Sequence, residues 1–240
     1  MQQATVYGLD IETDTTNDGL DPSVAAVVTV ALSGPKFDEV FVGDETTLLQ
    51  DLDRRLASLA PGVIATWNGS AFDLPFIADR ARILGVNLGL HLCLDHRLTL
   101  RRAPLPGHAG AYRGRWYRHT HLDTFRLYGA ASPSTHWASL RTVGRVLGLG
   151  NHATRNQRTQ DLTNEALHAH APSDARLARA LAERRWAAAL RMIDHVELAE
   201  AEMVSVAAGR MERRARGDAL SAAVGTMGLQ PSGLQRAAGR

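Results

Sequence analysis

The first residues with obvious chemical potential are two carboxylates one residue apart, Asp10 and Glu12. Asp10 lies near the end of the segment Thr5–Ile11, whose apolar and β-branched residues predict a strand, and Glu12 directly follows it. Because side chains alternate between the two faces of a strand, both carboxylates point to the same side. Neighbouring carboxylates repel each other unless a cation neutralises them, and Mg²⁺ binds such oxygens. The pair therefore indicates either a divalent metal site or a solvated strand end.

A third acid follows another short apolar segment. Val63–Trp67 predicts a strand, and Asp73 lies five residues beyond Asn68 in a predicted helix over Asp73–Leu84. Taken alone, Asp73 fits a helix N-cap and Asn68 fits a turn. If the two predicted strands belong to one sheet, however, three acids converge at one edge of that sheet.

A fourth acid lies late in the chain. Asp174 stands near the start of a long Ala-rich helix predicted over 173–204, shortly after His168 and His170. An acid in the first turn of a helix commonly interacts with the helix dipole alone.

The remaining segments predict an α/β domain with a mixed sheet, because strands come first and helices then alternate with later strands. Between residues 86 and 120 the pattern is irregular. The expected strands cover 5–11, 24–32, 39–42, 63–67 and 121–123, and the expected helices cover 44–59, 73–84, 140–149, 164–171 and 173–204.

Composition narrows the class of protein. With 240 residues, of which 45% are hydrophobic and 22% charged, the chain fits a globular domain over 1–206 followed by a basic, flexible tail over 207–240. The single Cys93 excludes a disulfide framework and a Cys-based zinc site. No apolar run is long enough for a transmembrane helix, and no secretory signal is visible, so we expect a cytoplasmic protein without a membrane partner. The net charge of +2 argues only weakly for nucleic acid.

The acidic motifs are similar to those of a known group. DIET at 10–13, NGSAFDLP at 68–75 and an Asp on a late helix resemble, in that order, the three motifs of the DEDD 3′–5′ exonucleases. The middle motif is most similar to the proofreading exonuclease domains of family B DNA polymerases and their stand-alone bacterial relatives. The resemblance spans residues 4–185 and implies a ribonuclease-H-like fold.

The resemblance also implies a reaction. Two divalent metal ions, Mg²⁺ or Mn²⁺, would clamp the scissile phosphate while nucleotides are removed from a single-stranded 3′ end, of DNA rather than RNA. Carried over by motif, the metal-binding and catalytic acids are Asp10, Glu12, Asp73 and Asp174.

The third motif departs from the family pattern. His170 stands where the tyrosine variant has Tyr, and Ala169 stands where the histidine variant has His. Pro172 also falls where the family has an uninterrupted helix. His170 is therefore either a catalytic general base or a surface residue, and both interpretations stay open. Asp194 competes as fourth acid, but the Ala-Arg-Leu sequence after Asp174 continues as the third motif commonly does.

A basic segment supplies candidate nucleic-acid contacts. No acid occurs between Arg97 and His121, where arginines alternate with aromatic residues. Arg neutralises phosphates and aromatic faces stack on unpaired bases, although a solvated loop with a few buried aromatics explains the pattern equally well. The candidate nucleic-acid-binding residues, including two from the middle motif, are Asn68, Phe72, Arg113, Arg115, Trp116 and Tyr117.

Three functions are consistent with the sequence. The first is a metal-dependent 3′–5′ exonuclease, and the second is a catalytically silent nucleic-acid-binding module of the same fold. The third is a non-catalytic interaction protein that uses the 173–204 helix as a partner surface. Nothing in the sequence identifies a polymerase or repair partner.

Overall fold

The structure, a computed structural model, describes residues 4–98, 100, 103–128, 139–149 and 164–197. Within the last range, the side chains of 164–170 and 194–197 are outside the description. The predicted tail over 207–240 also lies outside the described residues.

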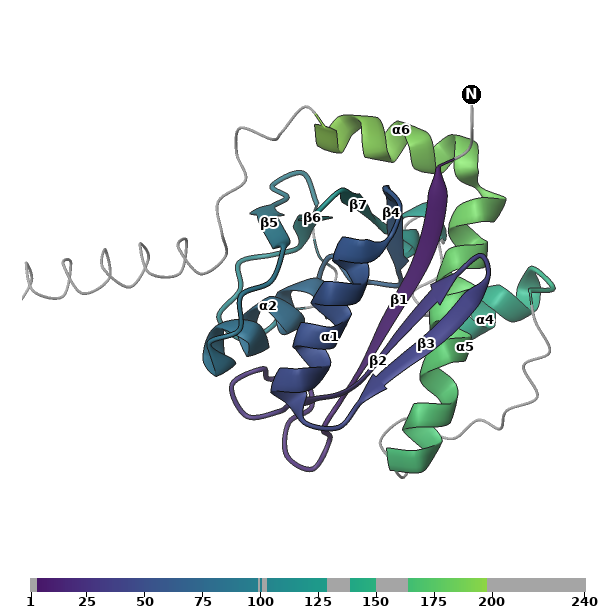
Figure 1. The fold of residues 1–240 in the computed structure, drawn as a ribbon. Helices are drawn as coiled ribbons and strands as arrows, with labels where there is room; N and C mark the ends of the chain where they lie inside the picture. Colours follow the sequence, from purple (N-terminus) through teal and green to yellow (C-terminus); the bar gives the residue numbers. More distant parts are fainter. Residues whose placement is uncertain (1–3, 99, 101–102, 129–138, 150–163, 198–240) are drawn as a thin grey trace, which may run out of the picture. The chain divides into compact units, whose positions relative to one another are not determined.

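A seven-stranded sheet forms the centre of the described part, in the order β3-β2-β1-β4-β7-β6-β5 (Figure 1). Its three middle strands, β1, β4 and β7, are parallel, and every other pairing is antiparallel. The α/β class with a mixed sheet is thereby confirmed. The strands are β1 (Thr5–Thr13), β2 (Val27–Gly34), β3 (Phe37–Val42), β4 (Gly62–Thr66), β5 (Leu90–Leu94), β6 (Tyr112–Trp116) and β7 (His119–Asp123).

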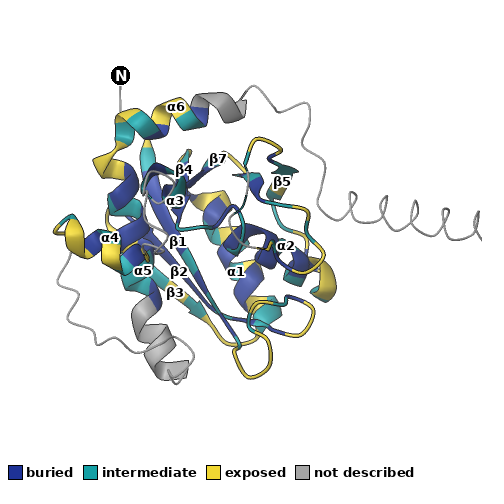
Figure 2. Cartoon of the chain, turned by 180° about the vertical axis from the view of Figure 1, so that it is seen from behind, coloured by how far each residue is buried: buried dark blue, intermediate teal, exposed yellow. Residues whose placement is uncertain are grey.

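Helices cover both faces of the sheet (Figure 1). One face packs against α1 (Glu45–Ser58) and α2 (Asp73–Leu84). The other face packs against α5 (Asn164–Arg184), α6 (Trp186–Glu197) and the short α3 (Thr124–Tyr128), and α4 (Leu140–Val146) packs on α5. Figure 2 shows that the strands between these layers are mostly buried.

The alternation of side chains along β1 decides which residues meet which layer. Tyr7, Leu9 and Ile11 belong to the core formed with α1 and α2. Val6 belongs to the core on the opposite face, with residues of α5 and α6. Asp10 and Glu12 lie an even number of residues after Val6 on the same strand. Their side chains therefore point to the same face as that of Val6, which is the face covered by α5, as the spacing predicts.

A close approach of backbones joins α5 to β1. A Cβ atom on Gly8 would overlap the backbone carbonyl group of Ala175. Ala171 and Ala175 are fully buried against Ala31 of β2 at the same contact. The small side chains of both elements therefore let the helix lie directly on the strand.

Two helical predictions are corrected by the structure. α5 does not begin after Pro172 but at Asn164, and Pro172 lies inside it. Proline removes one backbone donor from a helix, and the tight packing of Ala171 and Ala175 on the sheet is available to offset that loss. The long helix expected over 173–204 is instead divided at Arg185 into α5 and α6.

Two strands are absent from the sequence-based prediction. β5 and β6 occupy part of the irregular 86–120 segment and pair with each other, and β6 also pairs with β7. Each is only five residues long. Such short segments give a weak periodic signal, and their pairing is decided by partners distant in sequence.

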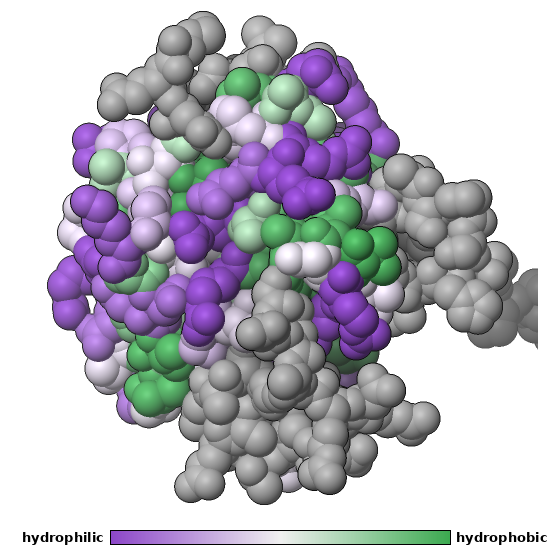
Figure 3. Space-filling view, turned by 90° about the vertical axis from the view of Figure 1, so that its right-hand side faces the viewer, coloured by the Kyte–Doolittle hydropathy of each residue, from purple (hydrophilic) through white to green (hydrophobic). Residues whose placement is uncertain are grey.

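The surface around α4 and α5 bears on the interaction-protein hypothesis. Figure 3 views the side on which α4 and α5 lie in Figure 1, and on its described part the apolar areas are separated by hydrophilic residues. A docking face for a partner commonly carries a larger contiguous apolar patch. No helix among the described residues is long and apolar enough to cross a membrane.

We predict that Gly8→Ala destabilises the fold by about 1–3 kcal/mol, because the added methyl group overlaps the backbone of Ala175. Urea unfolding of the variant and the wild type measures the difference. Gly110→Ala is the matched control, since its Cβ would meet only Leu94 at 3.4 Å. Equal unfolding free energies for the Gly8 and Gly110 variants would contradict the close contact.

Candidate active site

Four acids from three elements meet near one edge of the sheet. β1, β4 and β7 are parallel, so their carboxyl ends share that edge, where ligands bind in open α/β sheets. Asp10 and Glu12 lie near the end of β1, and Asp73 lies in the first turn of α2, shortly after β4. Asp174 on α5 completes the group by interacting electrostatically with Asp10 and Glu12.

Asp10 is the centre of this cluster. Burial raises its pKa well above the ordinary value, and repulsion from Asp174, Asp73 and Glu12 raises it further. Burial, followed by the repulsion from Asp174, raises the pKa of Glu12 to about 7. Burial is also the main reason that the pKa of Asp73 rises to about 8. The site therefore holds more negative charge than its surroundings neutralise.

Asp73 is not an N-cap, although its sequence position alone fits that simpler role. Phe72 takes the cap position without a side-chain cap, and Asp73 is buried in the first turn. Its carboxyl group is hydrogen-bonded to the backbone of Ile11, between the two acids of β1. This bond ties the middle motif to the first one.

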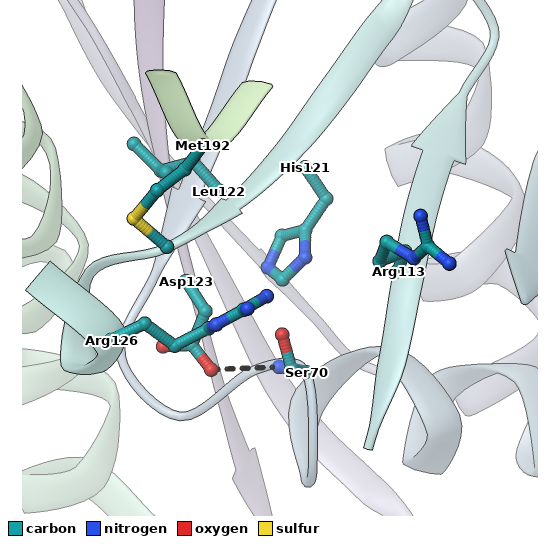
Figure 4. Close-up of a pocket in the computed structure, with 7 residues that line it drawn as sticks. All are labelled: Ser70, Arg113, His121, Leu122, Asp123, Arg126 and Met192. Atoms are coloured by element: carbon teal, nitrogen blue, oxygen red, sulfur yellow. Dashed lines mark hydrogen bonds between the residues drawn. The ribbon is translucent and has the colours of Figure 1, made fainter. Parts of the chain in front are cut away.

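The loop between β4 and α2 contains a strained backbone conformation that hydrogen bonds hold in place. Asn68 adopts a left-handed conformation with φ 67°. Its backbone N–H donates to Asp123 Oδ1 at 2.8 Å, and that of Ser70 donates to Oδ2 at 3.2 Å (Figure 4). Phe125 N–H donates to the same carboxylate at 3.0 Å. Strained backbone held by its surroundings is typical of functional sites.

Asp123 supports the backbone of the middle-motif loop. Both oxygens of its carboxylate accept backbone hydrogen bonds. His121 bonds Thr66 Oγ1 through Nε2 at 2.8 Å, and burial lowers its pKa to about 3, so the ring stays neutral at neutral pH. The buried carboxyl end of β7 therefore supports the backbone of the middle-motif loop.

A small polar pocket lies beside this support. Its lining residues come from β6, β7, α3, α6 and the middle-motif loop, and they are Ser70, Arg113, His121, Leu122, Asp123, Arg126 and Met192 (Figure 4). Arg126 contacts Asp95 at 3.2 Å, and Arg113 approaches Asp95 at 3.9 Å. The positive charge of the pocket is thus largely balanced by neighbouring carboxylates.

The other candidate nucleic-acid residues divide by position. Asn68 and Phe72 are half-buried in the middle-motif loop, and the Phe72 ring lies 5.4 Å from that of Phe76. Both residues lie in the loop that leads into Asp73. Arg113 lies further away, in the pocket described above.

The turn between β6 and β7 is remote from the acids. It lies at the amino end of β7, whereas the acids gather at the carboxyl end. Trp116 is 1% exposed and donates its Nε1–H to Asp53 at 2.7 Å, so its ring offers no face for a base. Tyr117 donates its hydroxyl to the same Asp53 at 2.5 Å, and Arg115 Nε donates to the Tyr117 carbonyl at 3.1 Å. The predicted grouping of Arg115, Trp116 and Tyr117 with the site is therefore not found.

The acid of the third motif, Asp174, has a partner that sequence reasoning missed. Arg141 of α4 binds both oxygens of Asp174, through Nη2 at 2.8 Å and Nε at 3.1 and 3.2 Å. No feature of the sequence distinguishes this arginine from the many others in the chain. The side chains of His170 and Asp194 lie outside the described residues, so their roles remain predictions.

The donor set of the cluster fits a hard divalent cation. All four acidic side chains offer only oxygen ligands, and their mutual repulsion would be relieved by a dication. Among the described residues, no three His, Cys, Asp or Glu side chains are yet arranged to hold one ion together. Both oxygens of Asp174 are hydrogen-bonded to Arg141.

The chain is similar to the exonuclease domain of family B DNA polymerases. Residues 6–103 match the family described as "DNA polymerase family B, exonuclease domain". One curated relative, the catalytic chain of DNA polymerase epsilon from Kluyveromyces lactis, is 32% identical over 83 residues, which is 35% of this chain and 3% of that protein. The family B DNA polymerase of the hyperthermophilic archaeon Pyrobaculum calidifontis superimposes with a TM-score of 0.59 at 21% identity.

These similarities cover different parts of the chain. The match to the archaeal structure covers 76% of this chain and 24% of the polymerase, and it confirms the ribonuclease-H-like fold. The family match includes Asp10, Glu12 and Asp73 but ends well before Asp174. The assignment of Asp174 to the site consequently depends on its position on α5.

We predict that the metal-free protein loses stability as the pH rises from 6.5 to 8. Asp73 and Glu12 have pKa values of about 8 and 7 in the folded chain, against ordinary values of 3.8 and 4.5. The folded state therefore binds more protons than the unfolded state in this window. For each extra bound proton, the free energy of unfolding falls by about 1.4 kcal/mol for every unit by which the pH rises.

Urea unfolding in EDTA at several pH values measures this slope. The window starts at 6.5 because the lowered pKa values of His119 and His121 act in the opposite direction below their ordinary value. Asp73→Asn should flatten the slope, since asparagine has no proton to lose. If the unfolding free energy of the wild type stayed constant or increased between pH 6.5 and 8, the raised pKa values of Asp73 and Glu12 would be contradicted.

Proposed function

We propose that the chain is a metal-dependent 3′–5′ exonuclease, because its residues 6–103 match the exonuclease domain of family B DNA polymerases and its fold is similar to that of such a polymerase. It would hydrolyse phosphodiester bonds one nucleotide at a time from a single-stranded 3′ end. DNA is the proposed substrate because the relatives are named as DNA polymerases.

One observation carries the proposal most directly. Asp10, Glu12, Asp73 and Asp174 come from three separate elements, yet the other three all act on the charge of Asp10. Acids that were only surface residues would not be gathered where their charges raise one another's pKa. Such a cluster is instead typical of a site that binds divalent cations.

We propose that these four carboxylates hold two divalent ions, Mg²⁺ or Mn²⁺. When bound, the ions activate a water molecule and stabilise the charge on the departing oxygen. The protein's own contribution is positional. The hydrogen bond between Asp73 and the backbone of Ile11 sets the spacing of the middle acid from the acids of β1.

Asn68 and Phe72 are the proposed contacts for the terminal nucleotide. Both lie in the loop that Asp123 holds in place, directly before Asp73. An aromatic ring can stack on a terminal base, and an amide can hydrogen-bond its sugar or phosphate. His170, four residues before Asp174, is the proposed general base in the position of the family tyrosine.

We predict that Asp10→Asn lowers exonuclease activity at least about a hundredfold, because loss of the central ligand displaces the reacting groups. The assay uses 5′-labelled single-stranded DNA with Mg²⁺, Mn²⁺ or EDTA and follows shortening from the 3′ end. Asp51→Asn is the matched control, since Asp51 lies on α1 and pairs with the exposed Arg54. Its activity should equal that of the wild type.

A catalytically silent nucleic-acid-binding module is the second candidate. Two observations favour it: Pro172 lies inside α5, and Arg141 engages the fourth acid. Retained DNA binding without shortening under either metal would support this module and overturn the exonuclease proposal. An RNA substrate run beside the DNA tests the proposed preference, and faster RNA cleavage would reverse it.

A further inference from the structure

Arg141 is built into the acidic cluster by its geometry. Its guanidinium donates to both carboxylate oxygens of Asp174, with the shortest contact at 2.8 Å. The side chains are 29% and 15% exposed, so the pair is largely withdrawn from solvent. A forked contact of this kind is stronger and more specific than a single surface ion pair.

The position of Arg141 is fixed by the packing of α4 against α5. α4 lies so close to α5 that a Cβ on Gly144 would be 2.7 Å from a Leu177 side-chain carbon. Leu140, next to Arg141, is buried against Leu177 and Leu181 of α5. The helix that carries the arginine is thus fixed on the helix that carries the acid.

Arg141 also acts beyond its direct partner. Its positive charge also interacts electrostatically with Asp10 and Glu12. One guanidinium therefore supplies positive charge to this group of acids. Both oxygens of Asp174 are occupied in the process.

We propose that Arg141 is a positioning residue of the metal site, which holds Asp174 in the metal-free protein and is displaced from it when a divalent cation binds. This inference rests on the proposed metal-dependent function. The arginine and the cation compete for the same carboxylate oxygens, so Arg141 stabilises the empty site and raises the metal concentration needed to fill it. The family motifs do not include this residue.

The proposal predicts opposite effects on two quantities when Arg141 is replaced by glutamine. Without a competing charge, Mn²⁺ should bind about tenfold more tightly. In EDTA, the melting temperature should fall by about 2–4 °C, because the acids lose their internal counter-charge. A purely structural residue would lower the melting temperature without tightening metal binding.

Isothermal titration of Mn²⁺ into the whole chain, without DNA, measures the first quantity, and thermal unfolding in EDTA measures the second. Arg145→Gln is the matched control, because Arg145 is exposed on the same helix and should leave both values unchanged. Arg141→Lys keeps the charge without the fork, and its Mn²⁺ affinity should lie between those of the wild type and Arg141→Gln.

The outcomes separate this inference from the function on which it rests. Unchanged or weaker Mn²⁺ binding by Arg141→Gln, in a chain whose wild type binds Mn²⁺ and shortens DNA, would overturn the role of Arg141 alone. A wild type that binds no Mn²⁺ would overturn both proposals. Tighter binding by Arg141→Gln, with a lower melting temperature in EDTA and an unchanged Arg145 control, would establish the competition.

Discussion

The site depends on one steric condition, the absence of a side chain at Gly8. Because no Cβ stands there, the backbone of α5 at Ala175 rests directly on β1. Asp174 precedes Ala175 along the helix, and Asp10 lies two residues beyond Gly8 along the strand. The same contact therefore places acids more than a hundred residues apart within electrostatic reach.

The acids brought together in this way oppose the stability of the fold. Burial and mutual repulsion raise the pKa values of Asp10, Glu12 and Asp73. Two kinds of cation can offset that repulsion, the guanidinium of Arg141 and a divalent ion. The proposed metal binding would thereby relieve an electrostatic repulsion that is already present in the folded state.

The two ends of β7 have different structural roles. The carboxyl end of β7 presents Asp123 to the backbone of the middle-motif loop and keeps Asn68 in its left-handed conformation. The opposite end of the same strand joins a turn that Asp53 of α1 anchors through Trp116 and Tyr117. One end of β7 therefore supports the site, and the other end supports the sheet.

The sequence by itself determined the α/β class, the first two acidic motifs and the common face of Asp10 and Glu12. These follow from local periodicity and from motifs whose residues are near one another in the chain. Only the tertiary structure decided the strands β5 and β6, the burial of Trp116, the continuity of α5 through Pro172 and the pairing of Arg141 with Asp174. Each of these depends on contacts between distant segments, and the packing energy of such contacts is not expressed in local sequence.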